Sequence, residues 1–169
     1  VMTSILGRPG KVLVLFGGGS AHRTGILGAV ENSLQESGFA VIEMGGVQPN
    51  PRTGFVRDTI DWVRDPGIRA VVAVGGDGTL NEVACGLMQL QHPPLLGYLP
   101  QGSTNDFAAS LRISSNPAEA AQALVPHQPR MLDVGPWNQP PFIHVASYGP
   151  LTTTHYNPHQ AAQNPPGPF

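Results

Sequence analysis

The most constraining feature of this 169-residue sequence is an alternation of short apolar runs with longer segments of helical spacing. Runs as apolar as these are typical of strands that are buried on both faces of a parallel sheet, with helices as the crossovers. The sequence therefore predicts an α/β fold of three layers, a Rossmann-like parallel sheet covered by helices on both faces. The predicted strands are Val12 to Phe16, Ala40 to Met44, Arg69 to Val74 and Leu95 to Leu99.

Apolar residues recur at intervals of three and four between these runs, which predicts helices. The apolar positions are Ile26, Val30 and Leu34, then Val56, Ile60 and Val63, then Leu80, Val83, Ala84 and Leu87. Gly38 follows the first helix where a C-terminal cap needs a left-handed residue. A short helix is expected from Phe107 to Leu111 and another at Pro117 to Val125, capped by Asn116. Met131 to Val134 and Phe142 to Ala146 are weaker strand candidates.

The end of the chain differs in composition from the rest. No Asp, Glu, Lys or Arg follows Asp133, and prolines are closely spaced beyond that point. Residues 150–169 show neither two-residue nor helical periodicity, and their prolines remove backbone donors. We therefore expect one nucleotide-binding α/β domain over residues 1–149 and a Pro-rich, irregular tail over residues 150–169.

Charge and cysteine content restrict the partners and the compartment. A net charge of -2 with nine Lys plus Arg provides no basic stripe for a phosphate backbone, so no nucleic-acid partner is expected. No window has the roughly 18 apolar residues of a transmembrane segment. Cys85 is the single cysteine, which excludes an internal disulfide. A cytoplasmic protein with only peripheral contact to a membrane is expected, and the histidine spacing predicts no metal site.

Three glycine-rich turns each link a predicted strand to a predicted helix. They are Gly17 to Ser20, Gly75 to Thr79 and, after Pro100, Gly102 to Asp106. All three should lie at the carboxyl edge of the sheet, where backbone N–H groups near a helix N-terminus can bind phosphate. Tight turns without a ligand would explain any one of them equally well. The candidate binding residues are Gly18, Gly19, Ser20, Gly75, Gly76, Asp77, Gly78, Thr79, Gly102, Thr104, Asn105 and Asp106.

The Gly75 to Thr79 turn is the most specific of the three because it contains Asp77. Its carboxylate could hold a nucleotide sugar hydroxyl or a hydrated metal ion. We expect Asp77→Ala to abolish nucleotide binding and to leave the fold nearly intact. Glu82 is equally well explained by the helix dipole, and Asn105 with Asp106 by helix capping. Because two polar turns leave neighbouring strands, we expect them to converge on one crevice.

The segments VVAVGGDGTLNEVACGL (71–87) and LGYLPQGSTNDFAASLRI (96–113), with LDVG at 132–135 and HVASYG at 144–149, resemble the diacylglycerol kinase catalytic domain family. This family includes bacterial lipid kinases and, more distantly, sphingosine and NAD kinases. The resemblance implies that Gly75 to Thr79 contact ATP with Mg²⁺, and that Gly102, Thr104, Asn105 and Asp106 lie nearby. It also implies γ-phosphate transfer from ATP to a lipid hydroxyl at a membrane surface. Ser103 stands where the family usually has Thr.

The first part of the chain, from KVLVLFGGGSAHRTGILGAV through GGVQPNPR and up to AVVAVGG (70–76), is instead similar to the nucleotide-binding domain of iron-containing alcohol dehydrogenases. That similarity leaves an NADP-binding module, or a non-catalytic chimeric or designed domain, as alternatives. Lipid kinases also carry a second, mostly β domain that supplies the catalytic base, and nothing in this sequence corresponds to it. The resemblance therefore implies a chain that binds nucleotide and phosphorylates lipid negligibly, with no catalytic residue identified.

Overall fold

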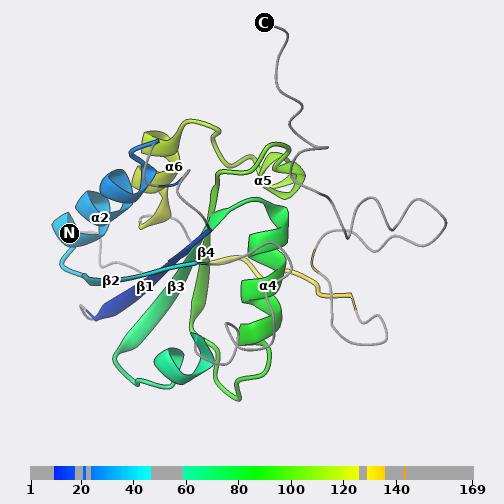
Figure 1. Ribbon diagram of the computed structural model, residues 1–169. Helices are drawn as coiled ribbons and strands as arrows, with labels where there is room; N and C mark the ends of the chain where they lie inside the picture. Colours follow the sequence, from blue (N-terminus) through cyan, green and yellow to red (C-terminus); the bar gives the residue numbers. More distant parts are fainter. Residues whose placement is uncertain are drawn as a thin grey trace, which may run out of the picture.

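The computed structural model describes residues 10–17, 21, 24–46, 59–125, 129–135 and 143. Its centre is a parallel sheet with the strand order β2-β1-β3-β4 (Figure 1). The strands are β1 (Lys11–Phe16), β2 (Ala40–Gly45), β3 (Ile68–Gly75) and β4 (Leu95–Pro100). Each lies within one residue of its predicted bounds, so the predicted parallel α/β sheet is confirmed.

Helices cover both faces of the sheet, which completes the predicted three layers. They are α2 (Ile26–Glu36), α4 (Asp77–Leu87), α5 (Asp106–Ser110) and α6 (Pro117–Leu124), and residues 59–63 are also helical. Helices α2 and α6 lie together on one side of the sheet, and α4 lies on the other (Figure 1). No helix in the described part of the chain is long and apolar enough to cross a membrane.

Two apolar clusters flank the sheet because successive strand residues point to opposite faces. Val12 and Val14 pack on the side of α2 and α6, and Leu13 and Leu15 pack on the side of α4. All four side chains are fully buried. Burial on both faces explains why the strands read as continuous apolar runs rather than as alternating ones.

The strand order places a topological switch between β1 and β3. From β1 the chain passes through α2 to β2 on one side, and it later returns to add β3 on the other side of β1. Helices that leave two neighbouring strands in opposite directions open a crevice at the carboxyl ends of those strands. Phe16 ends β1 directly beside Val74 of β3, so this crevice lies where the first two glycine-rich turns begin.

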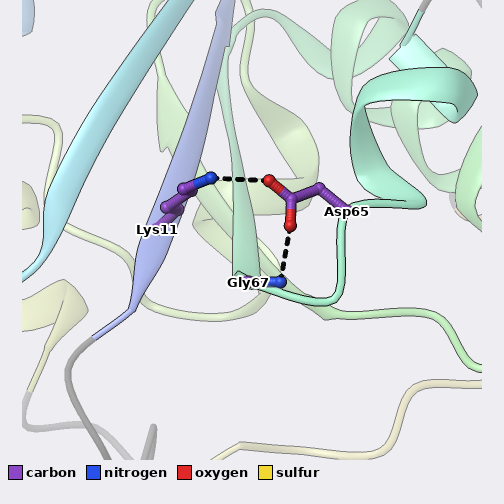
Figure 2. Close-up of polar contacts among 3 residues, drawn as sticks. All are labelled: Lys11, Asp65 and Gly67. Atoms are coloured by element: carbon purple, nitrogen blue, oxygen red, sulfur yellow. Dashed lines mark hydrogen bonds and ion pairs between the residues drawn. The ribbon is translucent and has the colours of Figure 1, made fainter.

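The amino ends of the strands are tied together by Lys11, Asp65 and Gly67 (Figure 2). Lys11 Nζ lies 2.7 Å from Asp65 Oδ2, and the Gly67 N–H donates to Asp65 Oδ1 at 2.8 Å. These two hydrogen bonds lower the pKa of Asp65 below its ordinary value. The interaction is therefore present near neutral pH and is lost as the pH falls through the lowered pKa. Its contribution is small because both groups are exposed to solvent.

The predicted helix ends are confirmed at two positions. Gly38 follows α2 with φ +85°, and its N–H donates to the Gln35 carbonyl. Asn116 caps the start of α6, and its side chain accepts a hydrogen bond from the Ala118 N–H at 3.0 Å.

Two weaker strand predictions have different outcomes. Residues 131–134 form no strand, so that prediction is wrong, and the Met131 side chain is 99% exposed. Apolar residues alone do not make a strand there, because a strand also needs a partner along its length. The prediction for Phe142 to Ala146 lies outside the described residues except for residue 143. The predicted tail at residues 150–169 lies wholly outside them.

The two glycines Gly28 and Gly38 provide a matched test of the α2 assignment. We expect Gly38→Ala to lower the free energy of unfolding by about 1 kcal/mol, because an L-residue is strained at a positive φ. Gly28 is exposed in the first turn of α2, and an added Cβ would meet nothing within 4 Å. Gly28→Ala should therefore raise the free energy of unfolding by roughly 0.5–1 kcal/mol. Urea unfolding of both variants measures the two signs, and equal effects would contradict the assigned ends of α2.

Candidate functional site

The candidate site lies where β3 and β4 end side by side. Gly75, the last residue of β3, is paired in register with Pro100, the last residue of β4. The Gln101 N–H donates to the Gly75 carbonyl at 2.8 Å, which extends the pairing by one hydrogen bond into the turns. The turn at Gly75 to Thr79 and the turn at Gly102 to Asp106 therefore leave the sheet at the same edge, as predicted from the sequence.

The two turns touch through their glycines. A Cβ on Gly102 would lie 2.5 Å from the Cα of Gly76, and a Cβ on Gly76 would lie 3.3 Å from the Cα of Gly102. The first distance is too short for any real side chain, so Gly102 is required by the close approach of the two backbones. Gly75 is restricted in the same way, since its Cβ would lie 2.6 Å from the Thr79 hydroxyl oxygen.

Asp77 joins the turns by hydrogen bonds from both of its carboxylate oxygens. Oδ2 accepts from the Asp106 N–H at 2.8 Å, and Oδ1 accepts from the Tyr98 hydroxyl at 3.1 Å. Asp77 is the first residue of α4 and Asp106 the first residue of α5. The carboxylate at the start of α4 thus accepts a hydrogen bond from the first backbone N–H of α5, which has no acceptor within its own helix.

Asn105 stabilises the second turn from within. Its side chain accepts from the Gly102 N–H at 2.8 Å and donates to the Gly102 carbonyl at 2.7 Å. Its backbone has φ +52°, a left-handed conformation that Asn tolerates better than most residues. Asn105 does precede α5, but its side chain makes no capping hydrogen bond to that helix. The capping interpretation of its side chain is therefore wrong.

The outer part of the site is open to solvent. Gly78, Ser103, Thr104 and Asp106 are exposed, whereas Asp77 and Asn105 are only partly exposed. The exposed residues surround the start of α4, an 11-residue helix whose first N–H groups have no intrahelical partner. A ligand at this edge would meet glycine backbone, hydroxyl groups and carboxylates.

The remaining predicted site residues are distributed as follows. Gly18, Gly19 and Ser20 lie outside the described residues. Glu82 lies on α4, and partial burial raises its pKa. Asn81, its neighbour, accepts a hydrogen bond from the Ile143 N–H at 3.1 Å. Within the described ranges no three His, Cys, Asp or Glu side chains are grouped as metal ligands.

Sequence reasoning missed Tyr98, which the structure places at the centre of the site. Only its membership of an apolar strand was recognised, because spacing within a strand does not indicate what the tip of a side chain touches. A usable signal was present, since Tyr98 is an aromatic residue with a polar end shortly before the carboxyl end of β4. Cys85 is buried, and burial raises the pKa of its thiol, as expected of a structural cysteine.

The family model for the diacylglycerol kinase catalytic domain matches residues 11–137. The chain belongs to this family. The match also includes the N-terminal part, which the motifs alone had placed nearer to the alcohol dehydrogenases.

Curated relatives have the same character. The protein named "Probable lipid kinase YegS-like" from Chromohalobacter salexigens is 47% identical over 87 residues, which is 50% of this chain and 28% of that protein. A diacylglycerol kinase from Staphylococcus haemolyticus is 35% identical over 99 residues, which is 59% of this chain and 30% of that protein. The matched region thus spans less than a third of either relative.

Two solved structures from Bacillus anthracis are also similar. The match to one of them covers 73% of this chain and 41% of the solved chain, with a TM-score of 0.60 and 26% sequence identity. The other, a diacylglycerol kinase, covers 67% and 40%, with a TM-score of 0.53 and 27% identity. Iron-containing alcohol dehydrogenase structures match too, at TM-scores of 0.47 and 0.48, a likeness too distant to support an inference.

The contact between the turns can be tested with two glycines. We expect Gly102→Ala to lower the free energy of unfolding by roughly 1–3 kcal/mol, because the new Cβ would collide with backbone that cannot rotate away. At Gly78 an added Cβ meets nothing within 4 Å, so Gly78→Ala should be neutral or slightly stabilising. Thermal unfolding of both variants checks the difference. A fully stable Gly102→Ala variant would show that the turns do not approach as described.

Proposed function

We propose that this chain forms the ATP-binding part of a lipid kinase that transfers the γ-phosphate of ATP to a lipid hydroxyl group. The observation that carries this proposal is the convergence of two glycine turns on one edge of the sheet, cross-linked by Asp77. Family membership supports the kinase class. The lipid acceptor is proposed from the similarity to a probable lipid kinase and to a diacylglycerol kinase.

The phosphate groups of ATP would lie against the turn that begins α4. Gly76 and Gly78 carry no side chain that would keep a phosphate from the backbone, and Gly78 is exposed. The unpaired N–H groups and the positive end of the helix dipole favour an anion at this position. Hydroxyl groups would be added by Thr79, Ser103 and Thr104. The exposed carboxylate of Asp106 would lie near the polar groups of the nucleotide.

The residues present fit a magnesium ion that arrives with the nucleotide. Mg²⁺ in such sites keeps several waters and binds one or two carboxylates together with substrate phosphates. Asp77 suits this role because each of its oxygens accepts one hydrogen bond and retains a further lone pair. When bound, the ion would neutralise charge that develops on the transferred phosphoryl group.

Positioning and electrostatics would supply most of the catalysis in such a transfer. The described residues would bind and orient the nucleotide so that an acceptor hydroxyl can attack in line. None of the carboxylates Asp77, Glu82 and Asp106 is proposed as the catalytic base. Because the matched region covers 28% to 31% of the curated relatives, lipid phosphorylation is proposed for the whole protein that contains this region.

Thermal unfolding with ligands tests the nucleotide part of the proposal. We expect Mg-ATP to raise the unfolding temperature, since a ligand at 100 times its Kd stabilises the folded state by about 2.7 kcal/mol. NADP at the same concentration and without Mg²⁺ should have no such effect, because no cation then offsets the repulsion between the carboxylate of Asp77 and a pyrophosphate at this turn. Stabilisation by NADP and none by Mg-ATP would favour a dehydrogenase-type module instead.

The variant Asp77→Ala should weaken both the fold and the site. The sequence alone suggested a fold left nearly intact, but the carboxylate accepts two hydrogen bonds that link the turns. We expect the free energy of unfolding to fall by about 1–3 kcal/mol and stabilisation by Mg-ATP to disappear.

Asp61→Ala is the matched control, because Asp61 has a side chain that is 69% exposed and pairs with the equally exposed Arg64. This variant should change neither the free energy of unfolding nor the stabilisation by Mg-ATP appreciably. Calorimetric titration of folded protein decides the outcome for Asp77. Unchanged ATP affinity in Asp77→Ala would make Asp77 a structural residue only.

A further inference from the structure

Tyr98 is buried in the sheet, yet its hydroxyl reaches the candidate site. It lies on β4, and its side chain belongs to the cluster on the α4 face. Its hydroxyl oxygen is 3.1 Å from Asp77 Oδ1 and 3.4 Å from Asn105 Oδ1. The Tyr98 hydroxyl therefore contacts both the Gly75 to Thr79 turn and the Gly102 to Asp106 turn.

The single hydroxyl proton of Tyr98 is directed to Asp77. Asn105 is held in one orientation, because its amide oxygen accepts from Gly102 and its amide nitrogen donates to Gly102. Its oxygen is thus already an acceptor, and it lies near the outer limit of hydrogen-bond distance from Tyr98. Asp77 Oδ1 is nearer and belongs to a carboxylate, which makes the stronger hydrogen bond.

The ring of Tyr98 is fixed by packing, so the hydroxyl has a defined position. The ring centroids of Tyr98 and Phe107 are 6.3 Å apart with an interplanar angle of 60°, a tilted aromatic pair. Both residues are more than 90% buried. Burial, together with the charge of Asp77 and the hydrogen bond to it, raises the pKa of Tyr98, so the hydroxyl remains a donor.

An apolar side chain would fill this position in the core without the cost of burying a hydroxyl. That cost is offset only when the hydroxyl is hydrogen-bonded. The Asp106 N–H donates to Oδ2 of Asp77 and the Tyr98 hydroxyl donates to Oδ1, so both carboxylate oxygens are restrained by hydrogen bonds. A carboxylate restrained in this way loses less entropy when it contacts a ligand, which is the general basis of preorganisation.

We propose that Tyr98 is a positioning residue that holds the Asp77 carboxylate in place for nucleotide binding. The inference rests on the proposed function, and it adds a residue of the sheet to a site otherwise built from turns. Tyr98 touches no nucleotide in this scheme and acts only through Asp77.

Tyr98→Phe keeps the ring and removes only the hydroxyl. We expect the affinity for Mg-ATP, measured by calorimetric titration, to fall about three- to tenfold, in line with the net contribution of one typical hydrogen bond. In the free protein the amide resonance of Asp106 should shift and its hydrogen exchange should accelerate. The Asp106 N–H donates to Asp77 Oδ2, so a less restrained carboxylate would weaken this hydrogen bond directly.

Ile68→Val is the control for a general loss of stability. Ile68 is buried at the opposite, amino end of β3, and its truncation to Val removes one buried methylene group and so lowers stability away from the site. It should leave both the ATP affinity and the Asp106 amide resonance unchanged. A Tyr98→Phe variant that binds Mg-ATP as tightly as the unmodified chain would overturn this inference alone, as would an unchanged Asp106 resonance. Failure of the unmodified chain to bind Mg-ATP would instead refute the proposed function, and the inference with it.

Discussion

Parallel pairing of β3 with β4, in register as far as Gly75 and Pro100, is the constraint on which the candidate site depends. Parallel strands that end at the same level deliver their following turns to one edge of the sheet. The hydrogen bond from Gln101 to Gly75 carries this alignment one residue further. The backbones then approach so closely that a side chain at Gly102 has no room. Gly102 is thus needed for the contact between the turns, whether or not a phosphate is present.

Asp77 serves the fold and the proposed site at once. Its carboxylate satisfies the backbone donor of Asp106 and the hydroxyl of Tyr98, and its free lone pairs remain available to a ligand. A carboxylate that accepts hydrogen bonds from the protein on both oxygens is held rigidly, which favours ligand binding. The same hydrogen bonds stabilise the fold, so ligand affinity and the free energy of unfolding are coupled. Variants of this carboxylate therefore have to be compared in folding and in affinity together, because a loss of ATP binding alone would not separate the two roles.

Family membership changes how the N-terminal part is understood. Its motifs resemble those of iron-containing alcohol dehydrogenases, and a chimera was one explanation for two resemblances in one chain. A single family model nevertheless spans residues 11–137, including β1, α2 and β2. The glycine-rich stretch between β1 and α2 therefore belongs to the same family match as the two turns of the candidate site.

The sequence by itself determined the four strands, the main helices, the Gly38 and Asn116 helix ends and the meeting of two glycine turns. Each follows from local physics: apolar periodicity, the conformational freedom of glycine and the rule that parallel strands share a carboxyl edge. Tertiary structure alone decided which groups meet. It gave Asp77 its two donors, turned Asn105 toward Gly102 and brought Tyr98 into the site. It also left residues 131–134 without a strand. These outcomes depend on contacts between residues far apart in the chain, and local sequence patterns do not specify such contacts.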